Sequence, residues 1–296
     1  MSSISSTFPI LVMTRNDNQF INKCVESIIN TVTIPITIYI VDNNSDSDEH
    51  HLILKELAER FENVNVVLNK NNYWVLGLNE TILKVKKNHI GKYFFLTDAD
   101  IDFSNCKAKP CWLSYMIECL EKNVSIGKLG ISLDWNYLSK HEKLYPILLQ
   151  EKSLYSDSKM INDLYVSSVD TTATLFRFDW SIEQSSFFYP DHMRYLRPEL
   201  YSCRTNREVL VEHLGWYTYN EASSLNKSHI NSKVLCFTLV GGDVKEAILE
   251  MSDFKYEFFY RTSASLIRKL WVLRRCFYQL KYYICKGVKN FDGQGV

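Results

Sequence analysis

Three carboxylates spaced two residues apart follow an apolar run in the first half of the chain. The run covers residues 93–96 and is followed by Thr97, Asp98, Asp100 and Asp102. Because it is short and rich in β-favouring side chains, it predicts a buried strand, and ligands bind beyond the carboxyl ends of such strands in open α/β sheets. Carboxylate oxygens are hard ligands, so Asp98 and Asp100 are candidates to hold Mn²⁺ or Mg²⁺ together with diphosphate oxygens. The alternative, commoner for an isolated Asp-x-Asp pattern, is a solvated acidic turn that caps the next helix.

The segments around this run alternate between strand and helix patterns. Short apolar or β-branched runs predict strands at residues 9–13, 36–41, 64–68 and 93–97. Helical spacing of apolar residues predicts helices at residues 18–31, 48–62, 79–87 and 112–123, and a further apolar run predicts a strand at residues 126–133. Strands and helices in alternation with short connections imply a parallel sheet covered by helices. The sequence therefore predicts an α/β fold in which polar loops follow the strands along one edge of a mostly parallel sheet.

Polar residues follow each of these predicted strands. Thr14 and Arg15 follow the first strand, residues 42–45 follow the second, and a polar loop at residues 71–79 leads from the third strand into a helix. In this order and spacing, and together with the carboxylate pair, these motifs resemble the nucleotide-sugar glycosyltransferases of the GT-A fold, close to the family 2-like group. The resemblance covers roughly the first third of the chain.

The resemblance implies a set of residues that contact a sugar donor. Asp42 would accept hydrogen bonds from the nucleoside, with Thr14 and Arg15 beside it, and an Asx-turn that orders its own loop is an equal alternative for Asp42. Gly77 and Asn79 would lie near the base. The donor-binding candidates are Thr14, Arg15, Asp42, Asn44, Gly77, Asn79, Asp98 and Arg197. The donor is expected to be a nucleoside-diphosphate sugar, with UDP as the first choice of nucleotide.

A second group of candidate residues comes later in the chain. It is preceded by residues 137–159, which are polar and weakly periodic and indicate an irregular excursion over the site or a plain surface loop. Two β-like runs then flank Asp170, which predicts a strand or hairpin at residues 164–177 that brings Asp170 to the site. The order Asp-Thr-Thr, Arg, then His213 in His-Leu-Gly-Trp-Tyr resembles a subset of bacterial glycosyltransferases of polysaccharide synthesis. In that subset the position of Gly215 is usually Pro, so the local turn departs from the pattern.

The resemblance also implies roles for the basic residues of this group. His213 would be the third protein ligand of the metal ion, since imidazole accompanies carboxylates around Mn²⁺-like ions. The alternative is a structural histidine that is hydrogen-bonded beneath Trp216. Arg194 or Arg197 would neutralise the donor diphosphate because guanidinium matches phosphate geometry, or either would be an ordinary surface cation.

Glycosyl transfer with inversion also needs a carboxylate that deprotonates the acceptor hydroxyl. Asp170 is the first candidate and Asp191 the second, because the relatives place an acidic base in this later segment. The Glu-Asp dipeptide that those relatives carry is absent from the segment. The structural alternative for Asp170 is that it binds the amides of Thr171 or Thr172.

Composition and charge argue against several classes of protein. The chain has 296 residues and a formal net charge of zero, which disfavours a nucleic-acid partner, and no Walker or Gly-x-Gly-x-x-Gly pattern occurs. The eight cysteines form no Cys-x-x-Cys pair and fit a reducing cytosol. Since the first residues lack signal-peptide features and no apolar stretch reaches about 18 residues, we expect a cytoplasmic protein.

The last part of the chain is basic and amphipathic. From residue 254 to residue 296 there are nine Lys or Arg and two Asp or Glu. Apolar residues recur at steps of four and three, which predicts one stripe of a helix formed by Leu266, Leu270, Leu273, Phe277, Leu280 and Ile284. Such a helix suits peripheral contact with an anionic membrane at the inner face of the cell membrane. The alternatives are that the stripe packs on the catalytic domain or pairs two subunits in a homodimer.

The sequence therefore predicts a GT-A catalytic domain at residues 1–250, with a nucleotide-binding half at 1–105 and an acceptor half at 106–250, and a helical extension at 251–296. The resemblance implies a metal-dependent glycosyltransferase that moves a sugar from a nucleoside-diphosphate donor to a glycan or lipid-linked glycan acceptor in surface polysaccharide synthesis (capsule, O-antigen or LPS). A nucleotidyltransferase is a rival, although it would normally carry a Gly-rich loop after the first strand. A non-catalytic glycan-binding or assembly module on the same fold is the other alternative.

Overall fold

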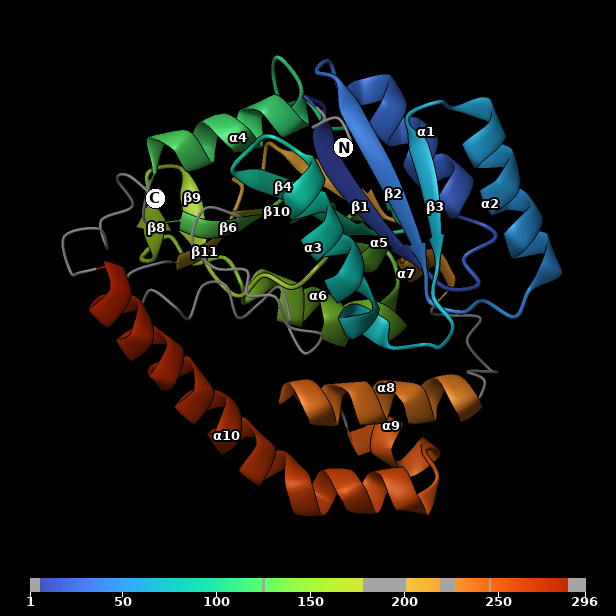
Figure 1. The fold of residues 1–296 in the computed structure, drawn as a ribbon, viewed down its shortest axis with the longest axis vertical. Coiled ribbons are helices and arrows are strands. Elements are labelled where there is room, and N and C mark those ends of the chain that lie inside the picture. The colour runs from blue at the N-terminus through green and yellow to red at the C-terminus, as the bar shows by residue number, and fades with distance from the viewer. Residues whose placement is uncertain (1–5, 124–125, 178–200, 219–226, 245, 287–296) are drawn as a thin grey trace.

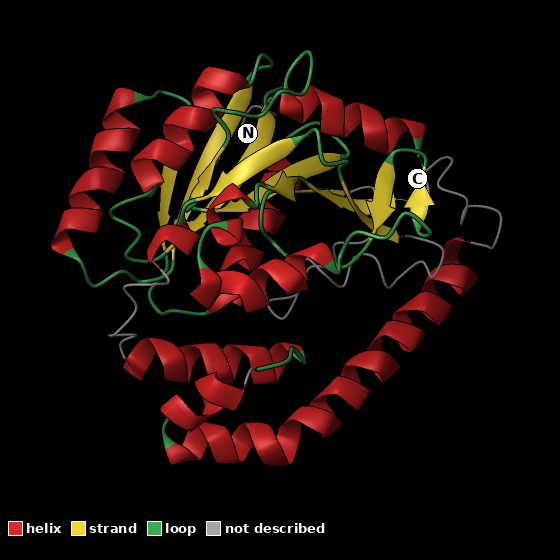
Figure 2. Ribbon diagram, turned by 180° about the vertical axis from the view of Figure 1, so that it is seen from behind, coloured by secondary structure: helices red, strands yellow, loops and turns green. Residues whose placement is uncertain are grey.

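Figure 1 shows the computed structural model of the chain, which describes residues 6–123, 126–177, 201–218, 227–244 and 246–286. A large sheet runs through the main body, helices cover both of its faces, and a separate layer of helices lies at one end of the molecule (Figures 1 and 2). Among the described residues the large sheet has nine strands in the order β3-β2-β1-β4-β10-β6-β11-β9-β8.

Four parallel strands form the half of the sheet that the sequence predicted in most detail. The strands are β1 (Phe8–Thr14), β2 (Ile36–Asp42), β3 (Val64–Leu68) and β4 (Tyr93–Asp98). The helical segments between them are α1 (Ile21–Thr31), α2 (Asp48–Arg60), the 3₁₀ helix η1 (Trp74–Leu78) and α3 (Asn79–Asn88). The strand β1 pairs in parallel with both β2 and β4, and β3 pairs in parallel with β2. The predicted α/β fold with a mostly parallel sheet is confirmed.

The other half of the sheet differs from the prediction in its pairing. Its strands are β6 (Ile126–Gly130), β8 (Met160–Ile161), β9 (Leu164–Val166), β10 (Thr174–Arg177) and β11 (Tyr201–Arg204). The strand β10 lies antiparallel between β4 and β6, whereas β9 pairs with β8 and β11. The hairpin predicted at residues 164–177 is therefore wrong, because its two runs belong to different parts of the sheet. The predicted strand at 126–133 is also divided, since it leaves the large sheet after Gly130.

The segment predicted as an irregular excursion, residues 137–159, is partly helical. It contains α5 (Asn136–Ser139), the 3₁₀ helix η2 (Glu142–Leu144) and α6 (Tyr145–Lys152). Their apolar side chains Leu138, Leu144 and Leu148 are buried in the main core. The loop prediction was wrong because elements this short show too few turns for a helical period to be visible.

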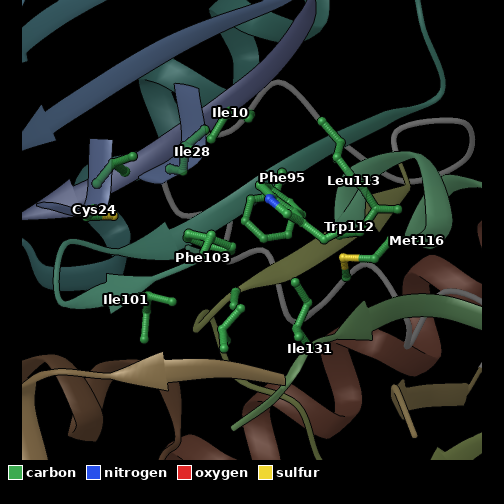
Figure 3. Close-up of a cluster of buried hydrophobic side chains, with 14 of the residues drawn as sticks. Ile10, Cys24, Ile28, Phe95, Ile101, Phe103, Trp112, Leu113, Met116 and Ile131 are labelled. Carbon is green, nitrogen blue, oxygen red and sulfur yellow. The ribbon is translucent and has the colours of Figure 1, made fainter. Parts of the chain in front are cut away.

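Alternating side chains of the strands build a core on each face of the sheet. Odd and even positions of a strand point to opposite faces, so Phe95 packs in one cluster while Phe94 packs in the other. The larger cluster also receives α1, α2 and the helix α4 (Trp112–Lys122), and the smaller one receives α3. Figure 3 shows the centre of the larger cluster, where the Trp112 ring lies 4.7 Å from Phe95 and 4.5 Å from Phe103, centroid to centroid. This packing fixes the end of β4.

A small second sheet carries the chain away from β4. It contains β5 (Ile101–Asp102), β12 (Leu210–His213) and β7 (Ser132–Leu133), in the order β5-β12-β7. The antiparallel pairing of β12 with β5 sets His213 opposite Ile101. Two segments that are more than a hundred residues apart in the sequence therefore meet directly after the carboxylate pair.

The C-terminal helices form a layer of their own beside the main body. They are α8 (Lys227–Val240), α9 (Glu246–Met251) and α10 (Phe254–Lys286), and they pack through Ile230, Val234 and Leu249. This layer lies at the end of the molecule toward which β1, β2 and β3 point (Figure 1), and Cys236 and Phe237 of α8 contact Tyr73 and Trp74 at η1. The predicted boundary at residue 250 falls inside this layer. None of the described helices combines the length and the apolar character that crossing a membrane requires.

Candidate functional site

The carboxylate pair lies where the chain leaves β4. Asp98 is the last residue of β4 and is paired in register with Met13 at the end of β1, and Asp100 follows in the turn before β5. The Thr172 hydroxyl donates to Asp98 Oδ2 at 2.6 Å, and the Cys24 thiol donates to the Asp98 carbonyl oxygen at 3.7 Å. Both carboxylates therefore lie at the carboxyl edge of the sheet, as the strand pattern predicted.

The turn between β12 and the short helix α7 (Gly215–Thr218) closes over Asp100. The Leu214 amide donates to the Asp100 carbonyl oxygen at 2.7 Å, and His213 Nδ1 lies 3.6 Å from Asp100 Oδ2. The His213 ring stacks on Trp216 with centroids 4.8 Å apart and planes 6° apart. A Cβ atom on Gly215 would come within 2.1 Å of Asp100 Oδ2, so the missing side chain makes room for the carboxylate. The Gly that departs from the expected Pro is required by this close approach.

Burial dominates the electrostatics of the three candidate metal ligands. It raises the pKa of Asp98 and of Asp100, and the charge of Asp100 raises the pKa of Asp98 further. Burial lowers the pKa of His213, and the charges of Asp98 and Asp170 act in the opposite direction. A neutral imidazole keeps a lone pair for a cation, and two partly buried carboxylates that repel each other are stabilised by a cation between them.

Polar atoms around Asp100 lack partners. Asp100 Oδ1 and His213 Nδ1 are buried and have no hydrogen-bond partner in the part of the chain that the structure describes. That part contains no group of three or more His, Cys, Asp or Glu side chains arranged to hold a metal ion, so Asp98, Asp100 and His213 do not come together as a set of three. Mg²⁺ is usually held by one or two carboxylates and takes its other ligands from substrate phosphates and water. Asp100 and His213 fit such a partial site, with Asp98 next to it.

The predicted nucleoside contact Asp42 is engaged by its own loop. One carboxylate oxygen accepts from the Ser45 amide at 3.0 Å and the other accepts from the Ser45 hydroxyl. His50 Nε2 lies 3.6 Å from Asp42 Oδ1 and 3.2 Å from the Thr14 hydroxyl oxygen. Thr14, Asp42 and His50 are all buried. The contacts of the Asx-turn interpretation are therefore present, and contact with a nucleoside stays a prediction.

Arg15 and Asn44 belong to the loops that follow β1 and β2. The Arg15 amide donates to Asp17 Oδ2 at 3.0 Å, and its guanidinium lies 3.9 Å from Asp46 Oδ2. Asn44 is exposed and adopts a left-handed backbone conformation, with φ 60°. Both residues lie at the predicted edge of the sheet, and their contact with a donor stays a prediction.

Gly77 and Asn79 lie in η1 and at the start of α3, beside the ends of β2 and β3. A Cβ atom on Gly77 would come within 2.1 Å of Asn43 Oδ1, so glycine is needed for η1 to approach β2. The Asn69 amide group donates to Asn43 Oδ1 at 2.9 Å and to the Gly77 carbonyl oxygen at 3.1 Å. Asn79 is buried. These contacts hold three chain segments together at the same edge as the carboxylate pair.

A cavity of about 470 Å³ opens beside the loop after β1. It is lined by residues 16–20, Glu49 of α2 and Thr218 of α7, which joins the β1 loop to the segment that covers Asp100. The pKa of Asp17 in its wall is raised to about 6, mainly by burial and also by the charges of Asp100 and Asp42, while hydrogen bonds from the Arg15 amide and the Thr14 hydroxyl act in the opposite direction. The volume is within the usual range for a small-molecule site.

Of the two residues predicted as the catalytic base, one lies within the part of the chain that the structure describes. Asp170 is exposed, and its Oδ1 accepts from the Thr172 amide at 3.0 Å, which is the structural contact that the sequence offered as an alternative. Its charge also acts on Asp98 and Asp100, so Asp170 lies within electrostatic range of the pair. Asp191 lies outside the described residues, as do Arg194 and Arg197.

Several residues at the site were missed by the sequence analysis. Lys23 is one of them, because its Nζ lies 2.9 Å from Asp102, the third carboxylate of the sequence pattern. Two further side-chain atoms are buried without a hydrogen-bond partner among the described residues. They are Oε2 of Glu151, which lies in α6, and Nη1 of Arg204. Burial raises the pKa of Glu151, the charge of Arg204 lowers it, and the charge of Asp170 raises it. Glu151 gave no signal because it lies in the segment interpreted as irregular.

Comparison with known proteins agrees with this fold. Residues 10–181, more than half of the chain, match the family described as glycosyl transferase family 2. A *Haemophilus influenzae* protein described as an uncharacterized glycosyltransferase is 30% identical over 126 residues, which are 42% of this chain and 36% of that relative. The chain therefore aligns with about a third of the length of this relative.

Solved structures with a similar course of the chain are much more distant in sequence. The mannosyltransferase PcManGT of *Pyrobaculum calidifontis*, in complex with GDP-Man and Mn²⁺, is 11% identical with a TM-score of 0.46, over 96% of this chain and 79% of that chain. TarS of *S. aureus* is 11% identical with a TM-score of 0.45, over 88% of this chain and 54% of that chain. On the family match, together with the α/β sheet and its carboxylate pair, the chain belongs to glycosyltransferase family 2.

Proposed function

We propose that this glycosyltransferase moves a sugar from a nucleoside diphosphate, UDP in the first instance, to a glycan or lipid-linked glycan acceptor of a surface polysaccharide, and that it needs Mn²⁺ or Mg²⁺. The observation that carries the proposal is the pair of buried, unpartnered atoms Asp100 Oδ1 and His213 Nδ1 at the carboxyl edge of the sheet. Burying such atoms without a partner costs about 1–3 kcal/mol each, and more for charged groups. A cation bound together with a diphosphate would remove that cost.

The residues around Asp100 support a divalent ion as part of the site. Asp100 and His213 would hold it, with Asp98 beside them, and the diphosphate would complete its ligands. When bound, a divalent ion neutralises negative charge that develops on a diphosphate leaving group. The chain itself orients the carboxylates, since Thr172 fixes one oxygen of Asp98 and Leu214 fixes the backbone of Asp100. Trp216 stacks on the His213 ring, which holds the imidazole beside Asp100.

The loops after β1, β2 and β3 would bind the nucleoside part of the donor. The cavity beside residues 16–20 supports this assignment, because it lies next to Arg15 and reaches α7. Gly77 and Asn79 would border the base from η1 and α3, and Arg197 would approach the diphosphate. Donor and carboxylates would then meet at one edge of the sheet, where ligands of open α/β sheets bind.

A carboxylate that accepts the acceptor proton completes the proposal. Asp170 and Asp191 are the candidates from the sequence, and the structure adds Glu151. Glu151 is favoured by its raised pKa, which suits a general base, and by its unpartnered buried oxygen. Residues 1–250 would form the catalytic domain. Residues 251–296 would bind this domain to a membrane, which we propose to be the inner face of the cell membrane.

Replacing Asp100 by alanine tests the proposal. With a panel of nucleotide sugars and Mn²⁺, we expect the release of the nucleoside diphosphate to fall by about a hundredfold or more, because charge stabilisation at the leaving group is lost. The matched control is Asp163→Ala, which removes an exposed carboxylate from a loop. Near-normal turnover of the Asp100 variant would remove the carboxylate from the mechanism. Calorimetry of the parent chain with UDP, GDP and dTDP, with and without Mn²⁺, then identifies the nucleobase of the donor. If no nucleotide binds, a non-catalytic module is favoured.

A further inference from the structure

Among the residues that the structure describes, the long helix α10 contacts the rest of the molecule through one of its sides. The contact side carries Ala264, Arg268 and Trp271. Ala264 is buried, the Arg268 guanidinium donates to the Gly242 carbonyl oxygen at 3.4 Å, and Trp271 Nε1 donates to the Leu239 carbonyl oxygen of α8 at 2.7 Å. Arg268 also pairs with Asp243 at 2.8 Å. Polar and aromatic groups, rather than the leucine stripe, therefore attach α10 to the body.

The opposite side of α10 is apolar and exposed. At 100° per residue the stripe spans roughly 80° and is centred about 160° away from Arg268. Its members are between 54% and 75% exposed, and they are Leu266, Leu270, Leu273, Phe277, Leu280 and Ile284. The interpretation that this stripe packs on the catalytic domain is therefore wrong for the described residues. Figures 1 and 2 show the second half of α10 leaving the layer of α8 and α9 and running along the side of the molecule toward the end of the large sheet that carries β8.

A continuous stripe of this size is unusual on a protein that stays free in solution. Single exposed apolar residues are normal, but contiguous apolar patches mark binding surfaces for proteins or membranes. Transfer of one such side chain from water to an apolar environment favours binding by about tenfold or more. Six of them on one line provide enough area to hold the whole chain on a surface.

The charges on α10 distinguish a lipid surface from a second copy of the chain. Between residues 258 and 286 there are seven Lys or Arg and no Asp or Glu. The positions of Lys269, Arg274 and Lys281 border the apolar stripe, roughly 60–80° to either side of its centre. Two copies paired through this stripe would bring these cations together, and the acidic residue of α10, Glu257, is already paired with Arg261. An anionic lipid surface attracts each of them, with about a fivefold gain in binding per cation.

We infer that α10 lies flat on an anionic lipid surface, with its apolar stripe in the interface and its flanking Lys and Arg side chains at the lipid phosphates. The helix has the character of an interfacial helix, since it has a charged border, an apolar face and no capacity to span. The layer of α8, α9 and α10 lies at the end toward which β1–β3 point, which is also the edge of the carboxylate pair (Figure 1). A lipid-linked acceptor in that surface would be held on the same side as the site. The lipid contact itself does not depend on the proposed metal or donor.

Sedimentation of the full chain with vesicles tests the inference. Vesicles of phosphatidylcholine are compared with vesicles that also contain phosphatidylglycerol, for the parent and for the double variant Leu270→Glu/Leu273→Glu. We expect the parent to bind the anionic vesicles, to bind them less as salt is added, and to lose about a hundredfold or more in partitioning when the two leucines are replaced. Both leucines are exposed, so the unfolding midpoint should stay unchanged.

The matched control is the double variant Leu52→Glu/Ile90→Glu, which adds the same charge at exposed apolar positions outside α10. It should partition like the parent. Equal partitioning of the two double variants, or failure of the parent to bind anionic vesicles, would overturn the inference. So would light scattering that shows a dimer of the parent and a monomer of the α10 variant, since the stripe would then join two copies.

Discussion

Replacing Gly215 by alanine should displace the Asp100 carboxylate while changing the stability of the fold only slightly. The added Cβ would lie 2.1 Å from Asp100 Oδ2, whereas ordinary contact begins near 3.4 Å, so the carboxylate must retreat by about 1.3 Å. It would retreat by rotating to a less favourable side-chain conformation, at a cost of about 1 kcal/mol. This cost is small beside the usual 5–15 kcal/mol of total stability, so the variant should fold with a melting temperature only about 2–4 °C lower.

The effect on the proposed reaction should be much larger than the effect on stability. A displacement of about 1 Å in a reacting or positioning group typically lowers a rate by about a hundredfold. We expect Mn²⁺ affinity by calorimetry and diphosphate release with the best donor to fall by about that factor. Gly91→Ala is the matched control, because a Cβ on Gly91 would have no atom within 4 Å.

A double-mutant cycle shows whether Gly215 acts through Asp100. In an Asp100→Ala background the carboxylate is gone, so Gly215→Ala should cause no further loss of Mn²⁺ affinity. An additive loss in the double variant would refute the reasoning, as would full Mn²⁺ affinity in the single Gly215 variant. In either case the close approach seen between Gly215 and Asp100 would have no part in binding the ion.

Three further predictions concern the buried acids of the site. Thr172→Val removes the hydroxyl that donates to Asp98, so the pKa of Asp98 should rise and Mn²⁺ binding, followed by calorimetry at several pH values, should require a higher pH. Burial raises the pKa of Asp17 to about 6 and also raises those of Asp98 and Asp100, so these three carboxyl groups bind more protons in the folded chain than in the unfolded chain above about pH 4. The lowered pKa values of His50 and His213 act in the opposite direction at two groups. The unfolding free energy of the metal-free protein should therefore fall as the pH rises from about 4 to above 6, and urea titrations that show the opposite slope would contradict these shifts. Glu151→Gln removes a buried charge, so it should leave the melting temperature unchanged or higher, while transfer to an acceptor falls by about a hundredfold and donor hydrolysis persists.

Local patterns predicted the first half of the fold well because its strands are buried and parallel. A run such as that of β2, Ile36–Asp42, is dominated by β-branched side chains and ends in polar residues, so its bounds are visible in the sequence. The carboxyl-edge position of Asp98 and Asp100 follows from the same pattern, since the chain must leave the sheet after β4. These features need no knowledge of distant contacts.

Contacts between distant segments could not be predicted in the same way. The strand β10 is short, and nothing in its four residues indicates that it inserts antiparallel between β4 and β6. The hydroxyl of Thr172 reaches Asp98 only because of that insertion. For α10 the apolar stripe was visible in the sequence, but which side faces the body depends on Arg268 and Trp271, whose partners lie on α8 and its following loop.

The acidic turn after β4 couples ligand binding to stability. Its backbone is held by Cys24 at Asp98 and by Leu214 at Asp100, and Thr172 and Lys23 bind the carboxylates of Asp98 and Asp102, so the backbone keeps Asp98 and Asp100 close together. Their raised pKa values mean that the metal-free site destabilises the folded chain once these groups are ionised. Because an ion that binds only the folded state stabilises it by about 2.7 kcal/mol at a hundred times its Kd, Mn²⁺ should offset this loss most strongly at high pH. A melting temperature that responds to Mn²⁺ equally at low and at high pH would show that the ion is bound away from these carboxylates.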